Sequence, residues 1–151
     1  MSLMLLVVLR ANARRWNVVC NRYRENGNIH RGGPVRAVRI TPNLPVADIG
    51  EANGFYQEFL GLQTEEFNLG WVARYTSPES GANVQLVTAD ATAAADSVMS
   101  VHADDVDAAY AEAQRRGYVI VHPLTTETWG VRRFLVRAPD GNVINIVQHR
   151  D

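Results

Sequence analysis

The sequence predicts an α+β protein built from paired βαβββ repeats. Three observations support this prediction: strands in which apolar and polar residues alternate, helices bounded by capping and stop signals, and repetition of the whole pattern. Asp48 and Gly61 of the first unit recur at nearly the same spacing as Asp105 and Gly117 of the second. Two such units are expected to pack together, because one four-stranded sheet with one helix buries little apolar surface alone.

The first unit is predicted over residues 35–89. Residues 35–43 alternate between polar and apolar, which is typical of a half-buried strand. Asp48 is the predicted N-cap of a helix that ends at Gly61. The apolar residues of this helix form one predicted stripe: Ile49, Ala52, Phe55, Tyr56, Phe59 and Leu60. Three further strands are predicted at residues 63–68, 70–77 and 82–88.

The second unit is predicted over residues 97–149, after a small, polar linker, DATAAAD, at residues 90–96. It repeats the order of the first, with a helix capped by Asp104 or Asp105. Its elements are a strand at 97–103, the helix at 104–117, and strands at 118–124, 130–138 and 142–149. Residues 35–149 are therefore expected to form a single domain of two modules.

Residues 1–34 precede the repeats and form an N-terminal extension. Their apolar run at residues 3–9 is too short to span a bilayer. A secretion signal is not expected, because Arg10 and other arginines follow the run and none precedes it. Two interpretations stay open: an appendage outside the fold, which we favour, or a helix over about residues 3–16 that docks on the domain or on a partner chain.

The composition excludes several classes of partner. Hydrophobic residues make up 46% of the chain, charged residues 21%, and the formal net charge is −1. This balance favours neither nucleic acid nor a membrane surface as a partner. Cys20 is the only cysteine, which excludes an internal disulfide and a cysteine-based metal site. A reducing compartment, the cytoplasm, is the expected location.

The two faces of the predicted sheet differ in polarity. One face carries apolar residues such as Val38, Ile40 and Leu86, which we expect to pack under the helices. The other face is mixed. It is either wetted by bulk solvent or shaped into a ligand cavity. Large apolar residues on this mixed face favour the cavity: Trp129, Leu135, Val143 and Val147.

Two stretches within the paired repeat resemble a known family. They are FYQEFLGL in the first unit and PDGNVINIV in the second. Together with the repeat over residues 35–149, they are similar to the vicinal oxygen chelate superfamily. That group includes glyoxalase I, extradiol dioxygenases, fosfomycin-resistance enzymes and bleomycin-resistance proteins. The resemblance implies the fold, a curved sheet around a cavity, but it leaves the chemistry open, because one scaffold hosts several activities.

The resemblance also implies where a metal would be held. Enzymes of the superfamily place four inward metal ligands, usually His or Glu, on the first and last strands of each unit. The matching positions here are Thr41, Gln85, Val98 and Asn145. Val98 has no donor atom and the other three are neutral, whereas transition metals favour imidazole, carboxylate or thiolate ligands. We therefore expect neither a metal nor another cofactor.

The inward polar residues are the candidates for ligand binding. Arg133 shares the parity of Leu135, where the resemblance to fosfomycin-type relatives implies a ligand contact, and Arg74 is the equivalent position in the first unit. Two inward arginines would attract an anionic or oxygen-rich ligand, unless each is paired with an internal acid. Trp129 is a candidate stacking wall, and the pattern leaves the facing of Trp71 open. The full predicted set is Thr41, Asn43, Arg74, Gln85, Ser100, Trp129, Arg133, Leu135 and Asn145.

Two histidines are the weak candidates for catalysis. His102 and His149 lie on strands that run parallel and adjacent in this fold, so their rings are expected to come close. They act as a base or a displaced metal site, or they are exposed histidines at strand ends, which is the interpretation we favour. His122 precedes a proline and is expected to be structural.

Three functions remain open from the sequence. The first is a metal-independent binding protein similar to the bleomycin-resistance branch, which would sequester a small molecule as in antibiotic resistance. The second is an enzyme of the same fold, a lyase, isomerase or oxygenase, with a metal-free or relocated site. The third is a dimerisation module with a vestigial cavity. The resemblance implies a homodimer in each case.

Overall fold

The computed structural model describes residues 35–149, and the segment proposed as an extension or docking helix lies outside the described residues. The first unit contains β1 (Ala37–Pro45), α2 (Ile49–Gly54), η1 (Phe55–Phe59), β2 (Thr64–Asn68), β3 (Val72–Thr76) and β4 (Asn83–Val87). The second contains β5 (Met99–Ala103), α3 (Val106–Arg115), β6 (Val119–Thr126), β7 (Val131–Arg137) and β8 (Val143–His149). The predicted α+β fold and its repeated βαβββ order are confirmed.

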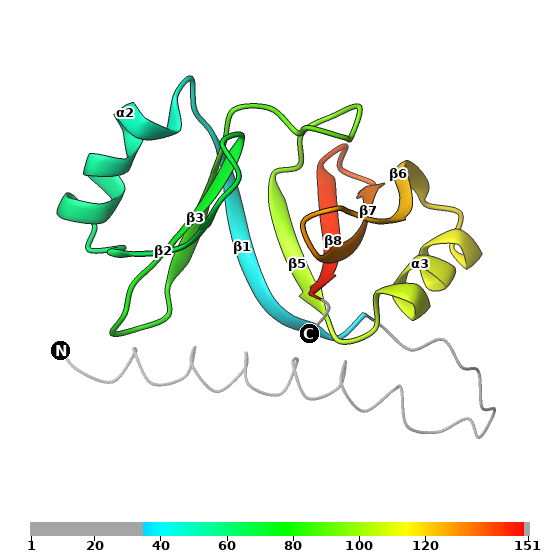
Figure 1. Ribbon diagram of the computed structural model, residues 1–151. Helices are drawn as coiled ribbons and strands as arrows, with labels where there is room; N and C mark the ends of the chain where they lie inside the picture. The colour runs from blue at the N-terminus through cyan, green and yellow to red at the C-terminus, as the bar shows by residue number, and fades with distance from the viewer. Residues whose placement is uncertain (1–34, 150–151) are drawn as a thin grey trace, which may run out of the picture. The chain divides into compact units, whose positions relative to one another are not determined.

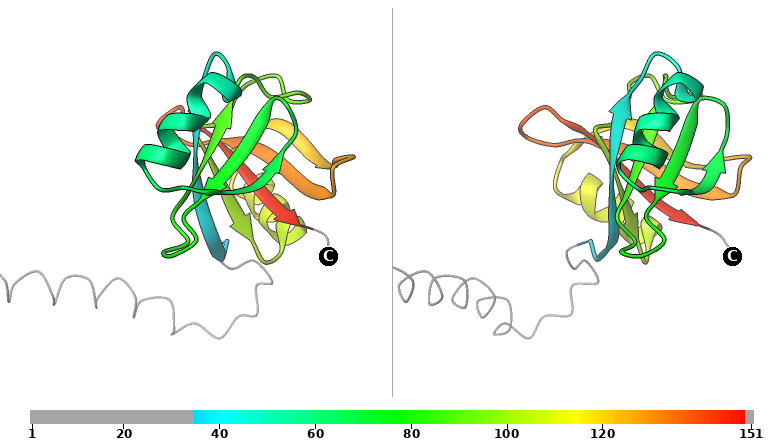
Figure 2. Two further views of the ribbon diagram at one scale, coloured as in Figure 1. Left: turned by 60° about the vertical axis from the view of Figure 1, so that its left-hand side comes forward. Right: turned by 90° about the vertical axis from the view of Figure 1, so that its left-hand side faces the viewer.

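The strands of both units join in one sheet with the order β2-β3-β4-β1-β5-β8-β7-β6. Each unit pairs its first and last strands in parallel, β1 with β4 and β5 with β8. The antiparallel pairing of β1 with β5 connects the units at the centre of the sheet. Figures 1 and 2 show that the sheet is curved and that α2 and α3 lie on opposite flanks of it. The inner side chains of both units therefore face a common concave surface.

Both helices begin and end where the sequence predicts. The carboxylate of Asp48 accepts a hydrogen bond from the Glu51 amide at 2.8 Å, and Asp105 accepts one from the Ala108 amide at 2.8 Å. These bonds satisfy amides that have no partner within the first turn. Gly61 and Gly117 follow the helices with a φ of 71° each, a conformation that glycine adopts without a steric penalty.

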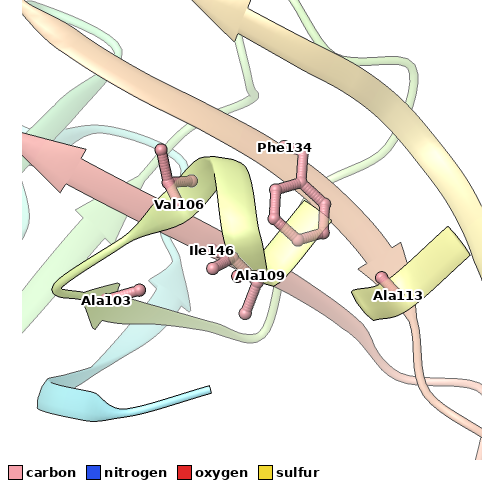
Figure 3. Close-up of a cluster of buried hydrophobic side chains, with 6 residues drawn as sticks. All are labelled: Ala103, Val106, Ala109, Ala113, Phe134 and Ile146. Atoms are coloured by element: carbon pink, nitrogen blue, oxygen red, sulfur yellow. The ribbon is translucent and has the colours of Figure 1, made fainter. Parts of the chain in front are cut away.

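Each helix covers its own apolar cluster on the outer face of the sheet. Figure 3 shows the cluster of the second unit, in which α3 packs on Phe134 of β7 and Ile146 of β8. Phe134 is 1% exposed, and burial of such a side chain contributes about 1.5–3 kcal/mol. The cluster of the first unit contains Tyr75 and Leu86 beneath Ile49 of α2.

The predicted apolar stripe of the first helix is only partly buried. Ile49 and Tyr56 pack on the core of the first unit, but Phe55 and Phe59 are 54% and 76% exposed. The helix widens into the π-helical turn η1, where the Leu60 amide bonds to the Phe55 carbonyl at 3.1 Å. This wider turn moves the later residues off the spacing of an α-helix, so the stripe prediction is wrong at its C-terminal end.

The outer face of the central strand β1 is also less covered than predicted. Val38 is 67% exposed and Ile40 is 57% exposed, whereas Leu86 is fully buried. The expectation that the whole apolar set packs under the helices is wrong for β1. The reason is the position of the helices, since α3 contacts β6, β7 and β8 and Figure 1 shows α2 on the other flank. In the part of the chain that the structure describes, no helix has the length and apolar character to cross a membrane.

Candidate functional site

The concave face of the sheet encloses a cavity of about 470 Å³. This volume lies within the range of roughly 300–1,000 Å³ that is typical of small-molecule sites. Side chains from both units line it, because the units meet at the β1–β5 pair. Six of the nine predicted ligand-binding residues line the cavity: Arg74, Gln85, Ser100, Trp129, Arg133 and Asn145.

The other three predicted residues do not line this cavity. Thr41 is fully buried and donates a hydrogen bond to Asn83 Oδ1 at 2.5 Å. Asn43 lines a void of about 20 Å³ next to the main cavity. Leu135 is fully buried and pairs with Asn145 between β7 and β8.

Amides and a hydroxyl form the floor of the cavity. The strand register places Gln85 beside Asn43 and Ser100 beside Asn145. Asn43 Nδ2 lies 3.2 Å from Ser100 Oγ, and Asn145 Nδ2 donates to the same oxygen at 2.9 Å. Asn145 Oδ1 is buried and has no hydrogen-bond partner among the described residues. A buried acceptor without a partner is costly, and a donor from a ligand or water that reaches it would remove this cost.

The residues at the four metal-ligand positions do not fit a divalent metal. Gln85 and Asn145 line the cavity, but Thr41 is bonded to Asn83, and Val98 is 45% exposed and precedes β5. Neutral amide and hydroxyl oxygens supply no charge to a transition metal. Over residues 35–149, no group of three or more His, Cys, Asp or Glu side chains is placed to hold a metal ion.

Arg133 is the centre of a buried ion network. Its guanidinium donates to both oxygens of Asp90 at 2.7 and 2.8 Å, and to Glu127 Oε1 at 2.8 Å. Burial opposes ionisation of Asp90, but hydrogen bonds from Arg133 and from the amides of Ala93 and Thr92 outweigh it and lower the pKa of Asp90. The network ties the linker between the units to β7, and it supports the alternative in which Arg133 is paired with internal acids.

Arg74 is held in a comparable way in the first unit. Its Nη1 donates to Glu66 Oε2 at 3.1 Å and its Nη2 to Gln85 Oε1 at 3.0 Å. The Phe67 ring lies 4.8 Å from the guanidinium carbon. Burial raises the pKa of Glu66, but hydrogen bonds from Thr76, Arg39 and Arg74 outweigh it and bring the pKa to about 2. The second inward arginine is therefore also paired.

The two candidate catalytic histidines stack on each other. The ring centroids of His102 and His149 lie 5.1 Å apart, with an angle of 11° between the planes. His149 is exposed and lines the cavity, whereas His102 is 8% exposed. Burial, and then the charges of Arg74, Arg39 and His149, lower the pKa of His102 to about 4. His102 is consequently neutral at pH 7, and its Nε2 lies 3.1 Å from Arg74 Nη2, which can only donate.

An aromatic wall closes part of the cavity. Trp71 and Trp129 line it with ring centroids 5.6 Å apart and an angle of 69° between the planes. The structure thus settles the facing of Trp71. Further lining residues that the sequence did not single out are Arg39, Glu66, Phe67 and Leu69. Strand alternation alone does not predict that Glu66 faces the cavity, because the pairing of β2 with β3 contains a bulge next to this residue.

Comparison with known proteins identifies the family. Residues 36–146 match the Glyoxalase/Bleomycin resistance protein/Dioxygenase superfamily, and the chain therefore belongs to that superfamily. The match confirms the resemblance drawn from the FYQEFLGL and PDGNVINIV stretches. A comparison with curated proteins found no match.

Several solved structures share the fold. Methylmalonyl-CoA epimerase from Mycobacterium tuberculosis is 21% identical, with a TM-score of 0.59 over 81% of this chain and 95% of that one. A superfamily member from Vibrio splendidus 12B01 is 20% identical, with a TM-score of 0.54 over 73% and 97%. The E323L mutant of homoprotocatechuate 2,3-dioxygenase from Brevibacterium fuscum is 20% identical, with a TM-score of 0.57 over 78% and 34%. At these identities the comparisons establish the fold alone.

Proposed function

We propose that this chain is a metal-independent small-molecule-binding protein that holds its ligand in the concave cavity, as in the bleomycin-resistance branch of the superfamily. The observation that carries the proposal is Asn145 Oδ1, a buried acceptor without a partner in a cavity-lining residue. It stands where the superfamily's enzymes place a metal-binding carboxylate. A neutral amide at this position is a poor metal ligand but can form a hydrogen bond directly to a bound molecule.

The composition of the cavity supports binding of a mainly apolar molecule. Indole rings of Trp71 and Trp129 and the side chains of Val72 and Val147 provide apolar surface. Gln85 and Asn145 add neutral polar groups at the floor, beside lining arginines that are already paired with acids. Apolar walls with a small number of placed polar groups are the usual form of a ligand site.

The state of the charged groups supports binding over turnover. A general base works best when its pKa lies near the operating pH. His102 has a pKa of about 4 and lies 3.1 Å from the donor Arg74 Nη2, so it is a weak base and already engaged. Arg133 is likewise bound to Asp90 and Glu127.

The proposal is tested with a broad panel of small molecules in a thermal-shift screen, because a ligand that binds the native state raises its melting temperature. The chain has three tryptophans, so a Trp16→Phe background leaves Trp71 and Trp129 as the fluorescent reporters of the cavity. We expect at least one compound to raise the melting temperature and quench this fluorescence. The hit is then recovered unchanged after incubation, and Trp129→Ala weakens its binding.

Tyr118→Ala is the matched control, since Tyr118 is an aromatic residue that does not line this cavity. Absence of any hit across the panel would contradict binding. Stoichiometric divalent metal in the purified protein, lost on replacement of His102 or His149, would contradict metal independence.

The second candidate function is an enzyme that uses His149, and the stacking of this exposed ring on His102 at the cavity favours it. Conversion of a bound compound, abolished by His149→Ala and by His149→Gln, would establish this alternative. Assembly as a homodimer stays a separate proposal, to be tested by analytical ultracentrifugation.

A further inference from the structure

We infer that the ligand is an uncharged aromatic molecule with a hydrogen-bond donor, which the cavity recognises through neutralised arginines, Asn145 Oδ1 and the Trp71–Trp129 wall. The inference rests on the proposed function and specifies the ligand class for the same cavity. It departs from the anionic ligand that inward arginines suggest when the sequence alone is considered.

The charged groups that line the cavity are already paired. Three guanidinium groups line the cavity, those of Arg39, Arg74 and Arg133. Glu66 binds Arg39 at 3.1 Å and Arg74 at 3.1 Å. Asp90 and Glu127 bind Arg133. Each of the three guanidinium groups is thus already in an ion pair, with Glu66 shared by two of them, and an anionic ligand finds no unpaired guanidinium group in this cavity.

The hydrogen bonds at the floor of the cavity leave one acceptor unused. The Asn145 amide already donates through Nδ2 to Ser100 Oγ, and its Oδ1 has no partner among the described residues. An oxygen acceptor can be satisfied only by an N–H or O–H group. A carboxylate or phosphate ligand would bring only acceptors to this oxygen, and would leave it unsatisfied.

Arg74 keeps one donor unused. Its Nε is buried and has no acceptor among the described residues. Any carbonyl, ester or carboxylate oxygen can satisfy this donor. Arg74 therefore accepts many ligand classes, and the unpartnered oxygen of Asn145 is the group that discriminates between them.

Two tryptophans contribute to the shape of the cavity. Trp71 and Trp129 meet edge to face at 5.6 Å and line the cavity. Indole faces bind flat aromatic rings through large apolar contact area. A bicyclic arene with one small polar group is the simplest probe that meets the charge, hydrogen-bond and shape requirements together.

Three related naphthalene compounds test the inference on the intact protein. Naphthalene-2-carboxamide is neutral and has a donor, methyl naphthalene-2-carboxylate is neutral without a donor, and naphthalene-2-carboxylate is an anion at pH 7.5. Each carries a carbonyl oxygen for Arg74. Affinities are measured by quenching of the cavity tryptophans in the Trp16→Phe background and by isothermal titration calorimetry.

We expect the carboxamide to bind about tenfold or more tightly than the carboxylate and the ester, since only the carboxamide brings a donor to the buried acceptor. In Asn145→Leu the carboxamide and the ester should bind equally. In Asn145→Asp, which keeps an acceptor, the carboxamide should stay preferred, so the two variants separate loss of the acceptor from loss of folding.

Three results would overturn the inference. Tightest binding of the carboxylate would show an anion site while leaving the proposed function intact. Equal binding of the carboxamide and the ester to the unsubstituted protein would show that the Asn145 oxygen does not select the ligand. Failure of all three compounds, with a hit in the broad screen, would reject this ligand class alone, whereas failure of both experiments would reject the proposed function as well.

Discussion

At the scale of the residue, the site is defined by which polar groups already have partners. The arginines that attract attention in the sequence are bound by Glu66, Asp90 and Glu127. Asn145, which the sequence also singled out, is the lining residue with a buried oxygen that lacks a partner. Satisfied groups stabilise the fold, and unsatisfied groups such as this oxygen favour a ligand.

Replacement of Arg133 tests the structural role of the buried network. Arg133→Met would leave Asp90 and Glu127 buried without a cation, and we expect a loss of about 3–5 kcal/mol in the free energy of unfolding. Arg132→Met is the control, because its pair with the exposed Asp107 contributes only about 0–1 kcal/mol. Urea denaturation measures both. Similar losses in the two variants would contradict the assignment.

The pH dependence of stability tests the environment of His102. Its pKa is lowered from 6.5 in the unfolded chain to about 4 in the fold, so the unfolded state binds the proton more readily between these values. The contribution of His102 to the free energy of unfolding should be fully present above pH 6.5. It should fall as the pH decreases towards 4, by at most about 1.4 kcal/mol per pH unit. His102→Asn should flatten this decrease in urea denaturation. The decrease below pH 4.5 should persist in the variant, because Glu66 has a folded pKa of about 2.

At the scale of the element, the strands and helices follow from local signals. The caps Asp48 and Asp105 and the stops Gly61 and Gly117 stand where the sequence places them. What the sequence did not reveal are contacts between distant positions. The pairing of Asp90 with Arg133 joins a linker to a strand far along the chain, and no periodicity records it. The cover of β1 depends on where the helices settle, which is a tertiary property.

Two phenylalanines test the contrast between the buried and the exposed helix-side residues. Phe134→Ala should reduce the free energy of unfolding by about 3–5 kcal/mol, because Phe134 is 1% exposed beneath α3. Phe59→Ala should change it by less than about 1 kcal/mol, because Phe59 is 76% exposed. Thermal or urea unfolding measures the pair, and a large loss for Phe59→Ala would show that this residue is covered in solution.

At the scale of the whole molecule, the two units contribute different parts to one cavity. The first supplies Arg74, Gln85 and Trp71, and the second supplies Trp129 and Asn145. The sequence predicted the fold, the concave site and most of its polar floor, because strand alternation determines which side chains face inward. It left open the charge of the site, because charge depends on pairs formed between elements.

Calorimetric titration of naphthalene-2-carboxamide into protein dialysed against EDTA tests the central claim, metal-independent binding in the cavity, most directly. We expect saturable binding with one site per chain, and an unchanged affinity after addition of Mn²⁺ or Zn²⁺. Binding that appears only when a divalent metal is added would contradict it.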